Sequence, residues 1–319
     1  MDNNVTIVMY HYVRDLINSR YPEIKGLDLN YFRQQIEFFS SKYTIISMEQ
    51  FIDNMENKTK LPPNSMMLTF DDGFIDHYTN VFPILSQNKI SGSFYVPAEV
   101  LSCDKVLDVH KIHYILASTS TKTIMKDLFS LLNFYRGKEF EFDSNESIYS
   151  KLALIGRFDD KDTIFIKRLL QVELPEKLRG ILVNELFKKY IAIDEESFSK
   201  ELYISYDQIK LMKKCGMHFG IHGYRHYWLE KLHLNEAKTD IRKSLDFYSD
   251  IIDSKSWTIS YPYGSRNEEL VEFVKSANCK VGLTTEVRIA NLSKDCMLNL
   301  PRLDTNDFPP KSNNYLNHY

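Results

Sequence analysis

The sequence has few of the features that mark a disulfide scaffold, a zinc knuckle or a nucleic-acid binder. Its four cysteines are far apart and form no C-x-x-C pair: Cys103, Cys215, Cys279 and Cys296. That spacing argues against a structural zinc knuckle and a disulfide framework, and it fits a reducing compartment. The formal net charge is -3 at pH 7. Because there is no basic excess, we expect no nucleic-acid partner.

Long apolar runs are also missing. No stretch approaches the ~20 apolar residues that a membrane-spanning helix needs. The acidic, polar start at residues 1–4 leads into an apolar run at 5–10 that is too short for a secretory signal. We therefore expect a cytoplasmic protein without a transmembrane segment, for which peripheral contact with a membrane enzyme complex stays open.

The chain does contain an alternation of apolar strands and amphipathic helices. The pattern predicts strands at 5–10, 43–47, 66–70, 92–97, 217–221, 258–261 and 280–284, and helices at 30–41, 48–57, 78–88 and 235–253. Such alternation is typical of a parallel α/β sheet or barrel. A charged stretch in between predicts helices only, at 112–117, 123–135, 162–170 and 175–190. We expect an α/β domain at 1–102 and 206–308, a helical insertion at 103–205, and a flexible tail at 309–319.

Two adjacent carboxylates follow the strand at 66–70. They are Asp71 and Asp72, and Gly73 comes directly after them. Neighbouring anions repel each other, so this arrangement gains most when a cation neutralises one carboxylate and the other stays free as a base. The alternative is a surface Asp-Asp-Gly turn after an edge strand, which is common in soluble proteins.

Two histidines four residues apart follow the strand at 217–221. His222 and His226 can meet one cation from a bent loop, which Gly220 and Gly223 favour over a helix. Gly223 also excludes the H-E-x-x-H helix of metalloproteases, which needs glutamate there. Such a pair taken alone is more often incidental. Joined by one carboxylate, it makes three ligands and leaves positions on a zinc-like ion open for water and substrate.

Three motifs of this chain resemble the polysaccharide deacetylase family, also called carbohydrate esterase family 4 or the NodB-homology domain. They are T-F-D-D-G at 69–73, His222 with His226, and Ser260-Tyr261-Pro262-Tyr263-Gly264, and they occur in the family's order. The resemblance implies a distorted (β/α)7-type barrel with the helical insertion outside it. It also implies roles for site residues: Asp71 as general base, Asp72, His222 and His226 as metal ligands, and Tyr263 or the Gly264 N–H at the oxyanion.

Three positions depart from the family pattern. Gly223 replaces the usual Ser or Thr of the histidine motif, whose hydroxyl helps to hold the loop. The third motif lacks the arginine that usually orients the catalytic Asp, and Arg302 is our candidate replacement. The late Leu-x-His, which supplies the general acid in many members, is replaced by Leu283-Thr284-Thr285-Glu286.

His11 is therefore the candidate general acid. One branch of the family begins with a strand ending in Y-H-x-V, and this chain has Tyr10-His11-Tyr12-Val13 at that place. The usual pKa of histidine, near 6.5, suits proton donation near neutral pH. The alternative is a histidine that only hydrogen-bonds a loop.

Further residues are candidates for substrate contact. Arg20, in the first loop, would suit an anionic group such as a carboxylate or diphosphate, although surface basic residues are usually only solvated. His110 and His113 lie at the head of the insertion. They indicate either a substrate lid with a second proton source or a helix start with ordinary surface histidines.

The resemblance implies a metal-dependent hydrolase that removes an N-acetyl group from a sugar in bacterial cell-surface glycan biosynthesis, of lipopolysaccharide or capsule. The sugar is expected on a nucleotide or lipid carrier or in an oligosaccharide. The expected ion is zinc, with cobalt, nickel or manganese as alternatives. Two other interpretations remain: a deacylase of another amide or ester on the same metal site, and a catalytically weak glycan-binding or scaffolding member in contact with glycan-assembly enzymes.

Overall fold

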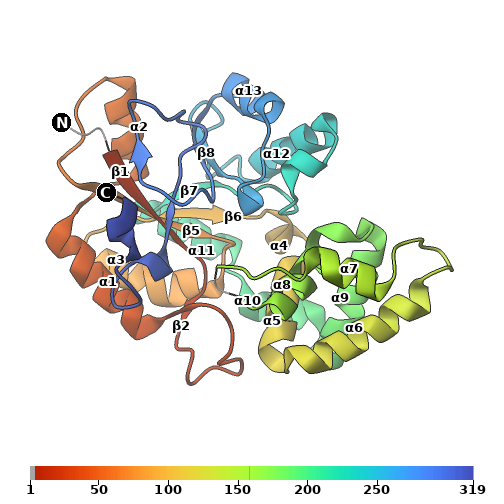
Figure 1. Ribbon diagram of the computed structural model, residues 1–319. Coiled ribbons are helices and arrows are strands. Elements are labelled where there is room, and N and C mark those ends of the chain that lie inside the picture. The colour runs from red at the N-terminus through yellow and green to blue at the C-terminus, as the bar shows by residue number, and fades with distance from the viewer. Residues whose placement is uncertain (1–3, 158, 319) are drawn as a thin grey trace. The chain divides into compact units, whose positions relative to one another are not determined.

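The chain forms two compact units in a computed structural model that describes residues 4–157 and 159–318 (Figure 1). The barrel unit holds the chain up to Asp15, Gly26–Lys105, and the chain from Ser199 onward. The helical unit holds Leu16–Lys25 and Val106–Phe198. The first loop, which the sequence analysis assigned to the barrel, therefore belongs with the helices, because its ring at Tyr21 packs against Tyr114 at 4.9 Å and Phe198 at 6.2 Å.

A curled sheet forms the centre of the barrel unit. Its order is β10 (Ala290–Asn291), β1 (Asn4–Tyr10), β5 (Ser65–Asp71), β6 (Ser93–Val96), β7 (His218–Ile221), β8 (Trp257–Ser260) and β9 (Cys279–Leu283), with β4 (Thr44–Ile45) beside β5 and β11 (Leu303–Asp304) beside β1. All neighbours are parallel except β1 and β10. A bridge from Leu283 to Leu300 links β9 to the segment that continues into β11. The expected α/β, distorted barrel fold is confirmed.

The strands read as continuous apolar runs because parallel strands are covered on both faces. Every residue of β5 is buried, including the terminal Asp71. In a parallel sheet the carboxyl ends of all strands lie at one edge, where ligands bind. Residues that follow β1, β5, β7 and β8 therefore converge at this edge, although Asp71 and Ser260, for example, are 189 positions apart in the chain.

Helices follow most of these strands. They are α1 (Leu29–Lys42), α2 (Met48–Glu56), α3 (Phe82–Gln87), α4 (Glu99–Ser102), α11 (Tyr206–Lys214), α12 (Leu234–Phe247) and α13 (Glu268–Ser276). Helix α12 ends six residues earlier than the expected 253. Tyr248 leaves the helical conformation, and its buried hydroxyl donates to the Val96 carbonyl oxygen at 3.2 Å.

The remaining short elements of the barrel unit complete its connections. They are a two-stranded parallel sheet of β2 (Val13–Arg14) and β3 (Leu27–Asp28), a π-helical turn at His77–Val81, and 3-10 turns at Leu229–Lys231, Pro262–Gly264, Thr305–Asp307 and Asn314–His318. In the segment expected to be a flexible tail, the Tyr315 ring stacks on Phe308 at 5.1 Å.

The helical unit has no strand among its described residues longer than a single bridge, as the sequence predicts. Its helices are α5 (Asp108–Ser118), α6 (Thr121–Tyr135), α7 (Asn145–Leu152), α8 (Lys161–Arg168), α9 (Glu176–Tyr190) and the start of α10 (Glu195–Leu202). Four of them match the expected helices, whereas α7 and α10 were missed because they are short and polar. Within the described residues, no helix is long and apolar enough to cross a bilayer.

Candidate metal centre

Three potential metal ligands meet at the carboxyl edge of the sheet. Asp72 follows β5, and His222 and His226 follow β7. One ligand atom from each residue lies within 4.8 Å of the others, and all three side chains are buried. Asp72 Oδ1 is 3.4 Å from His222 Nε2 and 3.3 Å from His226 Nε2. The structure thus brings the expected set of three together.

The spacing of these atoms suits a small tetrahedral cation. An ion with bonds of about 2.0–2.2 Å to nitrogen and oxygen keeps its ligand atoms about 3.3–3.6 Å apart. The Asp72–His222 and Asp72–His226 distances match this spacing. His222 Nδ1 is 2.6 Å from the Ser260 carbonyl oxygen and donates to it, which leaves Nε2 with its lone pair toward the ligand set. The donor set, two imidazoles and one carboxylate, is the chemistry that zinc prefers at sites with an open position.

Burial and the neighbouring charges have opposite effects on the pKa of His222. Burial lowers the pKa of His222, but the hydrogen bond to Asp72 and the negative charges of Asp71 and Asp72 raise it above its usual value overall. The two carboxylates therefore favour a positive charge at this position. Because a metal ligand must be the neutral imidazole, a cation at this site competes with protons.

The loops that carry these residues have strained backbones. Left-handed φ angles occur at Asp72, Gly73, Gly223, His226, Tyr263 and Gly264. Such conformations cost of order 1–3 kcal/mol each for a residue other than glycine and persist where the surroundings enforce them. Gly73 has little alternative, because a Cβ there would lie 2.4 Å from Val96 Cγ1. These left-handed positions lie in the segments that follow β5, β7 and β8.

Asp71 is held by Arg302, a residue 231 positions away in sequence. The two form a buried bidentate pair, Nη1 to Oδ1 at 3.0 Å and Nη2 to Oδ2 at 2.7 Å. Ser260 Oγ donates to Asp71 Oδ2 at 3.1 Å and accepts from Arg302 Nη2 at 3.0 Å. Burial raises the pKa of Asp71, but the charges of Arg302 and His222 outweigh it and hold this pKa below its usual value.

Arg302 itself is fixed by the segment that lacks the late histidine. Its Nε donates to the Thr284 carbonyl oxygen at 2.9 Å, and its backbone N–H donates to the Glu286 carbonyl oxygen at 2.9 Å. The carboxylate of Glu286 pairs with Arg288 at 2.7 Å on the surface. Arg302 thus contacts the same carboxylate that the family's third-motif arginine is expected to orient.

His11 lies at the end of β1 and is partly buried. Neighbours from the next strand-helix connection fix its backbone. His77 Nε2 is 2.9 Å from the His11 carbonyl oxygen, and Asp76 Oδ2 accepts from the Val13 N–H at 3.1 Å. Burial lowers the pKa of His77 to about 4, so at neutral pH His77 is uncharged and donates to His11. The positive charge of His11 is one of the influences that lower the pKa of Asp71.

Aromatic rings lie next to the ligand His226. The Tyr263 ring packs edge-on against it, with centroids 4.7 Å apart, and the Trp228 ring stacks on Tyr263 at 4.3 Å and an angle of 8°. Both rings are partly exposed. Tyr263 has a φ of 58°, which bends the P-Y-G segment so that Gly264 follows in a left-handed turn.

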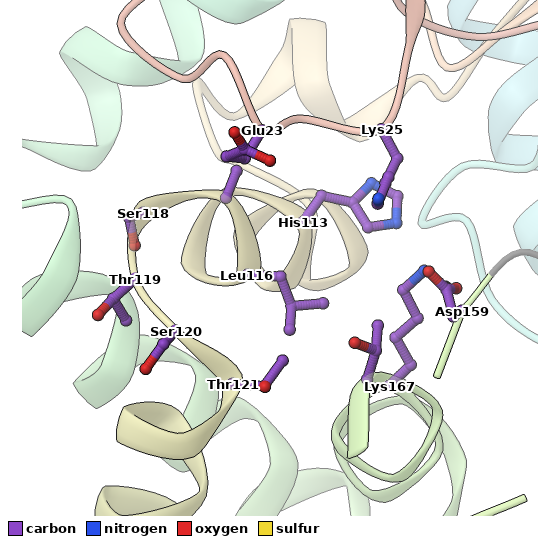
Figure 2. Close-up of a pocket in the computed structure, with 12 residues that line it drawn as sticks. Glu23, Lys25, His113, Leu116, Ser118, Thr119, Ser120, Thr121, Asp159 and Lys167 are labelled. Carbon is purple, nitrogen blue, oxygen red and sulfur yellow. Dashed lines mark hydrogen bonds and ion pairs between the residues drawn. The ribbon is translucent and has the colours of Figure 1, made fainter. Parts of the chain in front are cut away.

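Three expected site residues belong to the other unit. Arg20 lies in the first loop, and His110 and His113 lie on α5. His113 lines a cavity of about 410 Å³ in the helical unit, where Figure 2 shows it near Lys25 and Lys167, with Lys167 paired to Asp159. His110 is fully buried, so the interpretation of both histidines as ordinary surface residues is wrong for this one. Its neighbours within α5 and the helical core exclude water from it.

Sequence reasoning missed three residues of the site. Ser260 stood inside the third motif without a role, yet it contacts both Asp71 and Arg302. No motif marked Trp228 or Asp240, whose carboxylate accepts from backbone N–H groups of the loop between the two histidines. A clue existed for Asp240, since a buried-face position of an amphipathic helix that carries a carboxylate is unusual.

Known proteins resemble this chain in one sequence segment and in the overall fold. Residues 187–282 match the family model described as polysaccharide deacetylase, a segment that includes both histidines and the P-Y-G motif. No curated protein sequence matches the chain.

Solved structures share the fold over nearly the whole chain. The deacetylase PplD of Streptococcus pyogenes, in complex with acetate, has a TM-score of 0.59 and 18% identity, covering 99% of this chain and 97% of that one. IcaB from Ammonifex degensii has a TM-score of 0.58 and 16% identity, covering 99% and 96%. A de-N-acetylase from Aggregatibacter actinomycetemcomitans has a TM-score of 0.57 and 15% identity, covering 98% and 99%. The chain is thus similar to the polysaccharide deacetylase family over residues 187–282, and it shares the fold of solved deacetylase structures over nearly its whole length.

Proposed function

We propose that this protein is a metal-dependent hydrolase that removes the acetyl group from an N-acetylated sugar. One observation carries the proposal: a buried ligand set of Asp72, His222 and His226 lies beside a second carboxylate, Asp71, that has its own cation. The two members of the acidic doublet therefore face different partners. One suits a metal ligand and the other suits a base.

Asp72, His222 and His226 would hold the ion, with zinc as the first choice and cobalt, nickel or manganese as alternatives. When bound, such an ion supplies a Lewis acid that polarises a carbonyl group and makes water more acidic. Asp71 accepts the proton of the attacking water at its carboxylate. Arg302 and Ser260 keep that carboxylate oriented and ionised, at the cost of weakening it as a base, since they lower its pKa.

His11 donates a proton to the leaving amine in this mechanism. Its backbone is fixed by His77 and by the neighbouring contact of Val13 with Asp76, so its imidazole is presented from a rigid strand end. Tyr263 is the candidate donor to the carbonyl oxygen of the acetyl group, where negative charge develops. The expected donor role of the Gly264 N–H is not kept, because this N–H donates to the Tyr261 carbonyl oxygen at 2.8 Å. The products are acetate and an amino sugar.

The substrate side of the proposal rests on the aromatic pair of Trp228 and Tyr263. Partly exposed rings beside a metal site suit the apolar face of a sugar ring, which packs on aromatic surfaces. We include a nucleotide- or lipid-linked sugar or an oligosaccharide of a cell-surface glycan as the substrate class. The acetate in the PplD structure supports acetamide cleavage as the reaction, and so does the similarity to the Aggregatibacter de-N-acetylase.

The deciding experiment measures acetate release from a panel of N-acetylated nucleotide sugars, lipid-linked sugars and oligosaccharides, with zinc present and after chelation. We expect turnover on at least one carrier class that chelation abolishes and zinc restores. Matched O-acetylated sugars and N-formyl analogues separate this activity from a deacylase of other amides or esters. If no member of the panel is cleaved while the protein binds zinc tightly, the glycan-binding interpretation replaces ours.

His11 has its own test. His11→Ala should lower kcat by about 100-fold or more, and substrates with better leaving groups should lose less because they need less protonation. His77→Ala, which removes the hydrogen bond to the His11 carbonyl oxygen together with buried aromatic contacts, should have a smaller effect on kcat. An unchanged kcat in His11→Ala would show that a residue other than His11 is the general acid.

A further inference from the structure

The loop between the two histidine ligands is fastened from outside the metal site. Its middle residues, Gly223–Arg225, are called the histidine loop here. The Asp240 carboxylate, on α12, accepts from the Tyr224 N–H at 2.7 Å and from the Arg225 N–H at 3.1 Å. One turn further along the same helix, Ser244 Oγ donates to the Gly223 carbonyl oxygen at 3.1 Å.

Both fastening side chains are buried. Asp240 is 6% exposed and Ser244 is fully buried. A buried carboxylate without hydrogen bonds costs free energy. When it accepts hydrogen bonds from two backbone N–H groups, both the carboxylate and the loop backbone have hydrogen-bond partners. The loop cannot form helical or strand hydrogen bonds with these N–H groups, so Asp240 supplies the partners that its backbone lacks.

We propose that Asp240 is the positioning residue that sets the separation of His222 and His226, and so determines how tightly the site binds its metal. The inference rests on the proposed metal site. Neither contact of Asp240 reaches a ligand side chain. It acts instead on the backbone of the two residues just before His226, whose φ is 56°. The two charge-assisted bonds offset part of the cost of that left-handed conformation.

Gly223 and Asp240 form a matched pair in this arrangement. A Cβ built on Gly223 would lie 2.9 Å from Asp240 Oδ2, and the φ of Gly223 is 66°. The absence of a side chain at 223 therefore makes room for the carboxylate that fastens the loop. This explains why glycine occupies the position between a metal-type histidine and the rest of the loop.

The test compares Asp240→Asn, Asp240→Ala and Ser244→Ala with the control Asp246→Asn, an exposed residue of the same helix that makes the same charge change. Zinc affinity is measured by competition with a chelator at fixed pH, and the visible spectrum of the Co²⁺-loaded protein reports the coordination geometry. We expect zinc affinity to fall about tenfold in Asp240→Asn and up to about 100-fold in Asp240→Ala, as for other residues that orient ligands. Ser244→Ala should weaken zinc binding by a few fold, and the cobalt spectrum should change in the Asp240 variants only.

A double-mutant cycle adds a readout that a purely structural role would not move. Gly223→Ser should weaken zinc binding strongly in the parent protein, because its side chain meets the carboxylate. In the Asp240→Ala background the same change should weaken it less, since the clash with the carboxylate is gone and only the strain of a side chain at a φ of 66° remains. If the two substitutions acted independently, their fold-changes in zinc affinity would multiply in the double variant.

Three results would overturn the inference. They are zinc affinities of Asp240→Asn and Ser244→Ala within twofold of the control, an unchanged cobalt spectrum, or multiplicative effects in the cycle. Ser244→Ala and Asp240→Asn are conservative changes, so they keep the test decisive if Asp240→Ala does not fold. The proposed metal site and the proposed activity fail differently: without the site the parent protein itself binds no zinc, and without the activity it binds zinc but releases no acetate from any member of the panel.

Discussion

The barrel unit and the helical unit place their strain and their buried charges very differently. In the barrel unit, left-handed residues follow three strands at the metal centre, where buried ionisable groups also gather, and further left-handed residues such as Lys58, Lys89 and Asn278 lie at turns elsewhere in the unit. In the described part of the helical unit, the left-handed residues are Gly137 and Ala192, at a turn and after a helix end. Left-handed backbone and buried charged side chains, both of which cost free energy, occur together at the proposed metal centre. Both are rare in the helical unit.

Two buried cations make the contrast concrete. Arg302, in the barrel unit, contacts a buried carboxylate and two hydroxyl groups through a planar guanidinium. Lys111, in the helical unit, pairs with Glu195 at 2.8 Å and donates to Asn184 at 2.7 Å. The Arg302–Asp71 pair is fully enclosed and bidentate, so it fixes the orientation of the Asp71 carboxylate. The second is partly solvated on its acidic side, with Glu195 36% exposed, so it contributes mainly to packing.

The largest expected effect comes from removing a metal ligand. Asp72→Ala or His226→Ala should lower kcat/KM by about a thousandfold or more, because metal stabilisation of developing charge contributes several kcal/mol. The same variants should lose the rise in melting temperature that zinc gives the parent protein. Acetate release and thermal unfolding with and without zinc measure both. A zinc-dependent rise that survives in both variants would mean that the barrel edge holds no metal.

The next effect separates the two carboxylates of the doublet. Asp71→Asn removes the base but none of the expected ligands, so it should keep zinc binding while kcat falls by about 10²–10⁴-fold. Asp72→Asn is the matched variant and should lose both. Isothermal titration with zinc and the acetate assay give the two readouts. Loss of zinc binding in Asp71→Asn would contradict the division of roles.

The two buried cations provide the third prediction. Arg302→Lys keeps the charge but loses the bidentate contact, and it should lower kcat by about tenfold or more with zinc affinity nearly unchanged. Lys111→Ala should cost about 1–2 kcal/mol of folding stability, discounted for the exposure of Glu195. It should leave kcat and zinc affinity near those of the parent. Denaturant unfolding and steady-state kinetics on both variants test the comparison. If Lys111→Ala lowered kcat as much as Arg302→Lys does, the two cations would not differ in role.

The smallest effect concerns a pair at the opposite, amino end of the sheet. Glu49 contacts His218 Nδ1 at 2.8 Å, and although burial raises the pKa of Glu49, His218 lowers it to about 2 overall. A depressed carboxylate pKa adds stability above about pH 4.5 that is lost as the pH falls toward 2. Since Glu49 is 55% exposed, Glu49→Gln should cost about 1 kcal/mol or less at pH 7.

The pH dependence distinguishes this pair from a general packing effect. The stability difference between Glu49→Gln and the parent should shrink steadily between about pH 4.5 and pH 2. Urea unfolding at several pH values measures it, with zinc omitted so that the metal centre does not contribute. A difference that is constant over this range would show that the ion pair carries none of the effect.

Local patterns in the sequence determined the alternation of strands and helices, the helical character of the insertion, and the identity of the doublet and the two histidines. These features depend on apolar periodicity and on residues close together in the chain, so they leave a local signal. The order of the three motifs predicted a resemblance to the polysaccharide deacetylase family, and the family-model match at residues 187–282 and the shared fold agree with that resemblance.

Only the tertiary structure decided how distant parts combine. It brought Arg302 to Asp71 across 231 positions, Asp240 to the histidine loop, and the first loop into the helical unit. These contacts pair side chains with partners that have no fixed spacing in the chain, and the strand order of the sheet determines which of them meet. A local sequence pattern does not predict such a pairing, because the paired residues meet only when the parallel strands bring their carboxyl ends to one edge of the sheet.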